Sequence, residues 1–116
     1  MKHFLPLLII LPLLLCIACS DNWVDLNARV THTGPDIIVY NNDKFDWKEV
    51  KLELNDDYLV KINIIPAGSS RTFSLRKFTT RKEGRRFNHN THRVKTFWIR
   101  AKLKDGKKGS WLGNWN

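Results

Sequence analysis

Hydrophobic and polar residues alternate along most of this chain, which is typical of β-strands with one buried face. In one run Phe97, Ile99, Ala101 and Leu103 share one parity, and basic residues occupy much of the other. No stretch of about ten residues carries a helical stripe of apolar positions. The alternation predicts strands at positions 24–30, 37–40, 45–54, 58–64, 73–75, 97–103 and 110–115.

One of these predicted strands changes parity within its length. Phe45 and Trp47 lie at odd positions, whereas Val50, Leu52 and Leu54 lie at even positions. Successive side chains of a strand point to opposite faces of a sheet, so a change of parity requires an irregularity. The pattern predicts a β-bulge, or a strand that changes direction, in this stretch.

Turn residues separate the runs at intervals of about 8–12 residues, which predicts an all-β fold. We expect an antiparallel β-sandwich, immunoglobulin-like in the broad sense, with about seven or eight strands. A small closed barrel is the alternative. The Cys…Trp…Cys spacing of antibody domains is absent because both cysteines precede residue 20. The turn signals lie at Thr33–Asp36, Asn41–Asp43, Asn55–Asp57, Pro66–Gly68 and Asp105–Gly106.

The N-terminal segment is apolar without alternation. Lys2 precedes a nearly unbroken hydrophobic run from Phe4 to Ala18. A positive start, an apolar centre and a small residue at the end are typical of a secretory signal peptide. A spanning helix is the rival interpretation, but fifteen residues at ~1.5 Å each reach roughly 22 Å, less than the ~30 Å hydrocarbon core. Pro6 and Pro12 also disfavour a long helix.

The end of this segment, Cys16-Ile17-Ala18-Cys19-Ser20, resembles the lipobox of bacterial lipoproteins. The resemblance implies that the signal is cleaved before Cys19 and that this cysteine carries the acyl chains, palmitate included. The match departs from the family at Cys16, where Leu is usual. An ordinary signal followed by a free Cys19 thiol is the alternative.

This resemblance also implies how the chain is organised. Residues 1–18 would be the lipoprotein signal peptide, residues 19–23 the acylated Cys and a short tether, and residues 24–116 the β-sandwich domain. The protein would be anchored in the bacterial cell envelope. In a bacterium with two membranes, Ser20 after the acylated Cys favours the periplasmic face of the outer membrane.

About half of the mature chain resembles small uncharacterised bacterial exported proteins. The resemblance implies a β-sandwich with no assigned activity. It covers Ile38 to Phe87, and the residues that carry it are Val39-Tyr40-Asn41-Asn42-Asp43, Phe45-Asp46-Trp47, Val50-Lys51-Leu52-Glu53-Leu54-Asn55, Tyr58, Ile65-Pro66-Ala67-Gly68-Ser69, Phe73, Leu75, Phe78 and Gly84-Arg85-Arg86-Phe87.

Charge is segregated along the chain, whose net charge is +9. Ser20–Ser70 holds five basic and nine acidic residues, whereas Arg71–Lys108 holds fourteen basic and two acidic residues. Such asymmetry indicates an anionic partner. The alternative is a solvated basic face that protects the edges of the sheets from aggregation. The residues expected to contact an anionic surface are Arg76, Lys77, Arg81, Lys82, Arg85, Arg86, Lys107 and Lys108.

A lipid anchor restricts the anionic partners to those of the envelope. Anionic lipid, lipopolysaccharide and cell-wall polymers are the expected ligands, beside an unknown envelope protein. Nucleic acid has the required charge but lies in another compartment, so no nucleic-acid partner is expected.

Tryptophans supply the candidate aromatic contacts. Trp111 and Trp115 give the C-terminal end an aromatic surface that suits sugar rings or a lipid interface, with burial in the core as the alternative. Trp47 is expected in the core. Trp98 has the opposite parity to Phe97, so it faces outward or the other side of its sheet.

Metal and catalytic sites are not expected. His89 and His92 lie in a predicted loop without further ligands, and structural zinc needs four. A calcium site would need six or more oxygens, whereas the aspartates of the two acidic turns more commonly cap backbone groups. Motifs of hydrolases, P-loop proteins and zinc proteases are absent from the sequence. We therefore expect a non-catalytic interaction module without a cofactor, with a small hydrolase lacking a known motif as the weaker alternative. The turn aspartates are Asp43, Asp46, Asp56 and Asp57.

Overall fold

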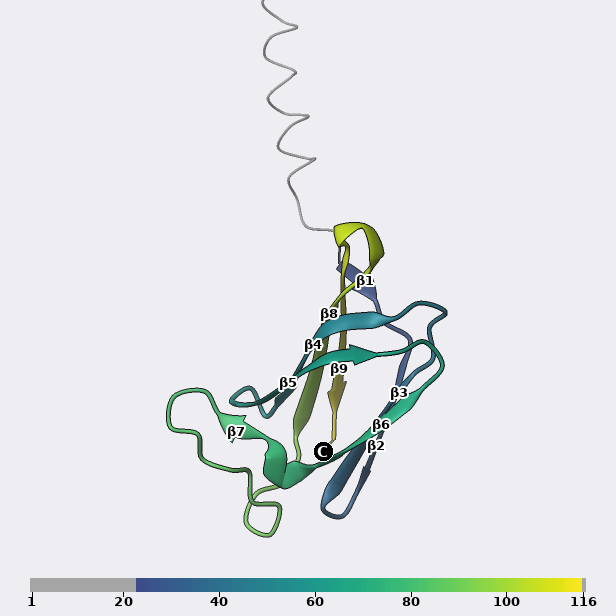
Figure 1. Ribbon diagram of the computed structural model, residues 1–116. Helices are drawn as coiled ribbons and strands as arrows, with labels where there is room; N and C mark the ends of the chain where they lie inside the picture. Colours follow the sequence, from purple (N-terminus) through teal and green to yellow (C-terminus); the bar gives the residue numbers. More distant parts are fainter. Residues whose placement is uncertain (1–22, 116) are drawn as a thin grey trace, which may run out of the picture.

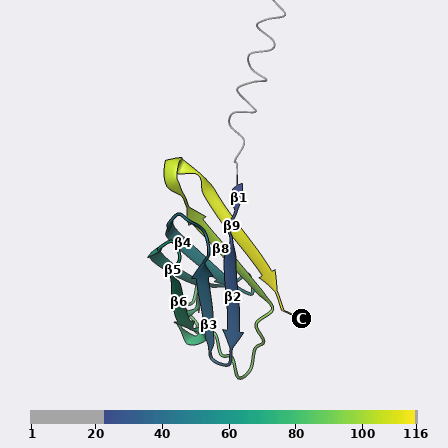
Figure 2. The same cartoon turned by 90° about the vertical axis from the view of Figure 1, so that its right-hand side faces the viewer.

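The chain folds into two packed β-sheets, so the expected β-sandwich is confirmed (Figure 1). The computed structural model describes residues 23–115, and the predicted signal peptide and Cys19 lie outside them. The six-stranded sheet contains, in spatial order, β1 (Trp23–Asp25), β9 (Lys108–Asn114), β8 (Thr96–Lys102), β4 (Trp47–Leu54), β5 (Tyr58–Ile65) and β7 (Thr79–Thr80). The three-stranded sheet contains β2 (Ala28–Thr33), β3 (Asp36–Asn41) and β6 (Ser70–Ser74), which lie side by side in Figure 2.

The core lies between the sheets and is built from alternate residues of the strands, apart from a change of parity in β4. In β8 Phe97 and Ile99 are fully buried, and Trp98 between them faces outward. Trp47 is fully buried, as expected, and its indole Nε1 donates to Asp43 Oδ2 at 3.0 Å. The largest of the other fully buried side chains are Phe78, Phe87, Ile37, Leu52, Leu54, Ile65, Leu75, Val39 and Val50.

The first predicted strand divides between the two sheets. Its start, β1, pairs in parallel with β9, and its continuation, β2, pairs with β3 in the other sheet. Leu26 lies at the crossing, is buried, and donates its amide to the carbonyl of Ser110 at 3.0 Å. Gly109 makes room for this crossing, because a Cβ there would lie 2.3 Å from Leu26 Cδ2. Alternation runs unbroken through the crossing and so does not reveal it.

This division changes two details of the expected fold. Residues 23–115 contain nine strands, more than the predicted seven or eight, because the first splits and β7 is a pair of residues. One strand pair is parallel in an otherwise antiparallel sandwich. Trp23, which the sequence assigned to the tether, is the first residue of β1.

The predicted irregularity is a β-bulge in β4. The register between β4 and β8 shifts between Lys48 and Lys51. Glu49, which lies between them, has a left-handed φ of 44°. The extra residue lets Trp47 and Val50 both point into the core.

Two of the predicted turns connect neighbouring strands with left-handed residues. Asn55 and Asp56 have φ values of 51° and 63° between β4 and β5, and Asp105 and Gly106 have 64° and 75° between β8 and β9. Consecutive residues with positive φ form the turn that matches the twist of a two-stranded ribbon. The β8–β9 turn includes the short 3₁₀ turn η2 (Lys104–Gly106).

The two ends of the sandwich differ in what they carry. The β8–β9 turn and the start of β1 lie at one end (Figures 1 and 2). The 3₁₀ turn η1 (Leu75–Lys77), β7 and the irregular segment 81–95 lie at the opposite end. Phe87 fastens that segment to the core by packing edge-on against Tyr58, with ring centroids 5.1 Å apart. Within residues 23–115, no helix has the length and hydropathy required to cross a bilayer.

Candidate anion-binding face

The outer face of the six-stranded sheet collects basic side chains from strands far apart in sequence. Alternation turns Leu52 and Ile99 inward, so Lys51 and Arg100 point outward. The cross-strand partners of these outward residues are also outward, which places one basic surface over β5, β4, β8 and β9. We call this surface the cationic face, and its basic residues are Lys48, Lys51, Lys61, Arg81, Arg100, Lys102 and Lys108.

Like charges lie directly opposite one another on this face. Lys51 is the cross-strand partner of Lys61 on one side and of Arg100 on the other. Lys48 is the partner of Lys102. Directly opposed residues have Cβ atoms about 4.5–5.5 Å apart, where like charges are destabilising. The sheet therefore concentrates positive charge on its central strands at a cost to its own stability.

A single carboxylate organises the arginines of the cationic face. Glu53 Oε1 accepts hydrogen bonds from Arg81 and from Arg100. The Glu53 side chain is 6% exposed, against 47% for Arg81 and 28% for Arg100. A buried carboxylate with two guanidinium partners holds both arginines in place while leaving part of each in solvent.

Aromatic and aliphatic groups border this cluster. The Arg100 guanidinium lies 4.5 Å from the centre of the Trp98 ring. Trp98 is the cross-strand partner of Glu53 on one side and of Leu112, which is 60% exposed, on the other. Leu59 is the partner of Glu53 on β5. A row that is apolar except for Glu53 therefore runs beside the row formed by Lys61, Lys51 and Arg100.

A shallow cavity of about 250 Å³ opens on the cationic face towards β1. Its lining combines positive groups with the Trp23 ring, whose centre lies 5.6 Å from Lys108 Nζ. Such a combination suits an anionic group attached to an apolar or sugar-like body. The cavity is lined by Trp23, Glu49, Lys51, Arg100, Ala101, Lys102 and Lys108.

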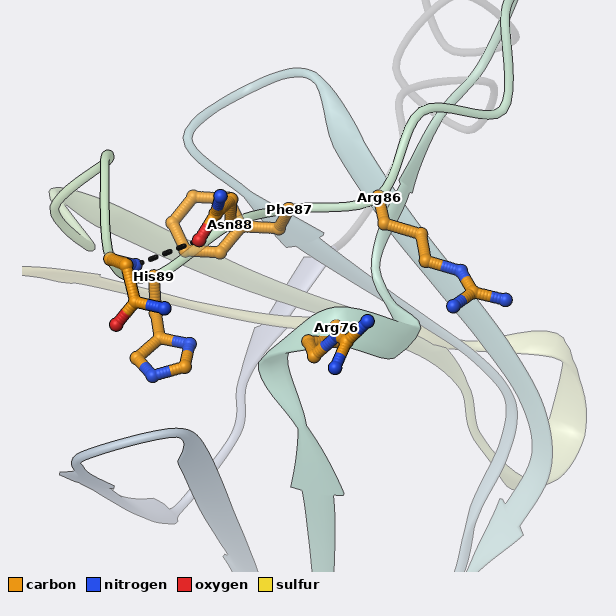
Figure 3. Close-up of a pocket in the computed structure, with 6 residues that line it drawn as sticks. Arg76, Arg86, Phe87, Asn88 and His89 are labelled. Carbon is orange, nitrogen blue, oxygen red and sulfur yellow. Dashed lines mark hydrogen bonds between the residues drawn. The ribbon is translucent and has the colours of Figure 1, made fainter.

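The six basic residues predicted between positions 76 and 86 do not converge on one site. Arg81 turns to Glu53, and Arg85 pairs with Glu83 at 2.7 Å. Arg76 and Arg86 line a cavity of about 400 Å³ with Phe87, Asn88, His89 and Asn90. Figure 3 shows Arg86 on the far side of Arg76 from His89, extending away from it. Lys77 and Lys82 are exposed.

The other predicted contacts are separated from this group. Lys107 and Lys108 lie at the end with the β8–β9 turn, opposite η1 and β7 (Figure 1). Trp111 and Trp115 pack partly buried against the core, with ring centroids 6.5 Å apart. Trp111, on the inner side of β9, and Trp115, just after β9, therefore belong to the core side rather than to the cationic face.

Sequence reasoning included Arg81 and Lys108 but missed most of the cationic face. It omitted Lys51, Lys61 and Arg100, because these residues are scattered over three strands. Parity was the available signal, since Lys51 lies between the buried Val50 and Leu52, Arg100 lies between the buried Ile99 and Ala101, and Lys61 lies between two partly buried aliphatic residues. The prediction that Trp98 points to the opposite side of its strand from Phe97 is confirmed.

The aspartates of the turns serve the backbone and the core. Asp43 Oδ2 accepts from the Asn27 amide at 3.1 Å as well as from Trp47, and Asp46 Oδ1 accepts from the Ala67 amide at 2.9 Å. His92 Nδ1 lies 2.9 Å from the Thr91 hydroxyl. Among residues 23–115, no three His, Cys, Asp or Glu side chains gather as metal ligands would.

Comparison of the chain with protein-family models, with curated proteins and with solved structures gave no match. A function for this β-sandwich must therefore be argued from the chemistry of its surfaces.

Proposed function

We propose that this protein is a lipid-anchored, non-catalytic interaction module of the bacterial envelope that binds an anionic ligand on the cationic face. The anchor is the acyl group expected on Cys19. The ligand class is a phosphate- or carboxylate-bearing polymer or glycolipid of the envelope. The observation that carries the proposal is the row Lys61, Lys51 and Arg100, in which like charges are direct cross-strand partners.

Edge protection does not account for Lys51 and Arg100, although Lys61 lies on a part of β5 that β7 does not pair with. Lysines that prevent sheet-to-sheet aggregation belong on edge strands, where backbone groups are unpaired. Here the edge strands of the six-stranded sheet are β1 and β7, whereas Lys51 and Arg100 lie on the central strands β4 and β8. An anionic ligand would neutralise the repulsion that these positions carry in the free protein.

The arginine cluster supports the same ligand. Glu53 orients Arg81 and Arg100, while its own carboxylate is covered by its neighbours on the cationic face and is 6% exposed. The parts of Arg81 and Arg100 that remain in solvent are available for phosphate or carboxylate, to which arginine donates strong charge-assisted hydrogen bonds, whereas Arg100 Nε is buried. Trp98 and Leu112 offer an adjacent apolar surface.

Binding to an immobilised polyanion tests the ligand class. We expect the protein to be retained on dextran sulfate, to be released by salt, and to pass through neutral dextran. Each basic residue near an anionic surface contributes about 1 kcal/mol, so the double variant Lys51→Gln/Lys61→Gln is expected to bind roughly 30-fold more weakly. The matched control is Lys77→Gln/Lys82→Gln, which removes the same charge outside the cationic face. Equal losses in both variants would reject a specific face.

Palmitate labelling tests the anchor separately. Cells that produce the wild-type protein are expected to show a labelled band that disappears in Cys19→Ser. An unlabelled wild-type band would remove the anchor from the proposal while leaving the polyanion result unaffected.

A further inference from the structure

The end of the sandwich at which the described chain begins carries a compact basic surface with an exposed tryptophan. Trp23 is 46% exposed and is the direct cross-strand partner of Lys108 in the parallel β1–β9 pair. The β8–β9 turn adds Lys104 and Lys107, both exposed, with Asp105 as the acidic residue between them. We call Trp23, Lys104, Lys107 and Lys108 the basic tip.

From this arrangement we infer that the basic tip docks on the anionic phospholipid headgroups of the membrane that holds the anchor. The inference rests on the proposed acylation of Cys19. It adds an orientation: the β8–β9 turn faces the bilayer and the segment 81–95 faces away from it.

The length of chain before β1 determines which end can dock. Trp23 is four positions after Cys19, and an extended chain spans at most about 3.6 Å per residue, so Trp23 lies within roughly 14 Å of the acylated residue. Neighbouring strands are about 4.8 Å apart, so Lys108, the cross-strand partner of Trp23, is also close to the acylated residue. The basic tip is thus the part of the described domain nearest to the anchor.

Distance also decides which basic groups respond to the membrane charge. β8 contains seven residues and rises about 3.4 Å per residue, which places the opposite end of the sheet roughly 20 Å farther away. The Debye length at physiological salt is about 8 Å, so charges at that end are screened from the surface. Lys104, Lys107 and Lys108 belong to the β8–β9 turn and the start of β9, at the near end, whereas Lys77 ends η1 and Lys82 follows β7, and both of these elements lie at the far end (Figure 1).

The chemistry of the basic tip suits the headgroup region. Tryptophan is enriched at membrane–water interfaces, where its ring is apolar and its N–H is hydrated. The ammonium of Lys108 lies 5.6 Å from the centre of the Trp23 ring, so the cation and the ring meet the surface together. Lysines near an anionic leaflet raise the occupancy of the docked state by about fivefold each.

Quenching of tryptophan fluorescence by brominated lipid tests this orientation. The full, acylated protein is reconstituted into vesicles of brominated phosphatidylcholine, with or without phosphatidylglycerol. We expect more quenching in the anionic vesicles, loss of that excess in Trp23→Phe, and its reduction by salt. In Lys104→Glu/Lys107→Glu the ratio of docked to undocked protein is expected to fall by at least about 25-fold.

Two controls separate this inference from the proposed function. Lys77→Glu/Lys82→Glu carries the same change of charge at the far end and is expected to leave the quenching unchanged. Lys104→Glu/Lys107→Glu leaves Lys51, Lys61 and Arg100 intact, so retention on dextran sulfate is expected to persist, and an unchanged circular dichroism spectrum shows that this variant folds. Release of the wild-type protein from neutral vesicles by an alkaline wash would contradict the anchor and not the basic tip.

Three results would overturn the docking itself. The first is quenching that ignores lipid charge or persists at full strength in Trp23→Phe. The second is quenching that requires lipopolysaccharide in the vesicle, which would assign the basic tip to that glycolipid. The third is cross-linking of Lys107 between two copies of the chain on the vesicle, which would assign the surface to self-association.

Discussion

Glu53 shows how one side chain can both stabilise this protein and prepare a surface for a ligand. It is 5% exposed on a face otherwise dominated by cations, and it receives hydrogen bonds from Arg81 and Arg100. Burying a carboxylate is costly unless it is paired and hydrogen-bonded, and here two partners share it. Removing the carboxylate leaves both guanidinium groups without this acceptor next to Trp98.

Glu53→Gln is expected to lower the free energy of unfolding by about 2 kcal/mol, because it removes the charged acceptor of a largely buried cluster whose arginines remain partly solvated. Urea denaturation measures the change. Glu83→Gln is the matched control, since its pair with Arg85 is exposed by 63% and 72% and such pairs contribute about 0–1 kcal/mol. Equal losses in the two variants would contradict a structural role for Glu53.

The β4–β5 turn shows how local backbone geometry sets strand register. Asn55 and Asp56 both have positive φ, and the Asn55 side chain links the turn to β8 by accepting from the amides of Lys95 and Thr96 at 2.7 and 3.1 Å. Positive φ strains a residue with a Cβ, although Asn and Asp tolerate it better than most residues. Asn55 therefore contributes side-chain hydrogen bonds to the turn, whereas Asp56 contributes only its backbone conformation.

Asp56→Gly is expected to raise the free energy of unfolding by about 0.5 kcal/mol, because glycine adopts positive φ without a steric cost and follows Asn in the favoured turn. Thermal denaturation monitored by circular dichroism measures this gain. Asp57→Gly, one residue later and outside the positive-φ pair, is expected to destabilise by about 0.5–1 kcal/mol. A loss of stability in Asp56→Gly would mean that its carboxylate makes a stabilising contact.

Across the assembled sandwich, charge opposes folding on one face. Lys51 has Lys61 and Arg100 as direct neighbours on the two adjacent strands, and Lys48 faces Lys102. Salt screens such repulsion between exposed charges. These residues in the central strands lower the stability of the fold and concentrate positive charge on one face. Functional surfaces commonly combine these two effects.

Lys51→Gln is expected to stabilise the protein by about 0.5 kcal/mol, because it removes two opposed like-charge contacts. Urea denaturation at low and at high salt measures this gain, which is expected to shrink when salt screens the remaining charges. Lys77→Gln, which has no cross-strand partner, serves as the control and is expected to change stability little. Destabilisation by Lys51→Gln at low salt would contradict the repulsion on which the proposed function depends.

The grouping of basic residues could not be predicted from their spacing. Arg76 to Arg86 are close in sequence, yet a backbone in irregular conformation directs Arg81 to Glu53 and Arg85 to Glu83, while Arg86 extends away from His89 (Figure 3). Trp111 and Trp115 were candidates for ligand contact because they are aromatic and close together. Trp111 lies on the inner side of β9, and both tryptophans pack against the core.

The structural features that the sequence alone predicted are those that depend on residues close together in the chain. Alternation of period two predicted the strands, their buried faces and the bulge near Glu49, and residues such as Asn55, Asp105 and Gly106 predicted the turns. Pairing between distant strands was beyond that reasoning, because it depends on packing rather than on neighbouring residues. Glu53 meets Arg81 and Arg100 across separations of 28 and 47 residues. The crossing at Leu26 and the cationic face exist because the two sheets close over one core, which brings outward residues of separate strands into a single surface.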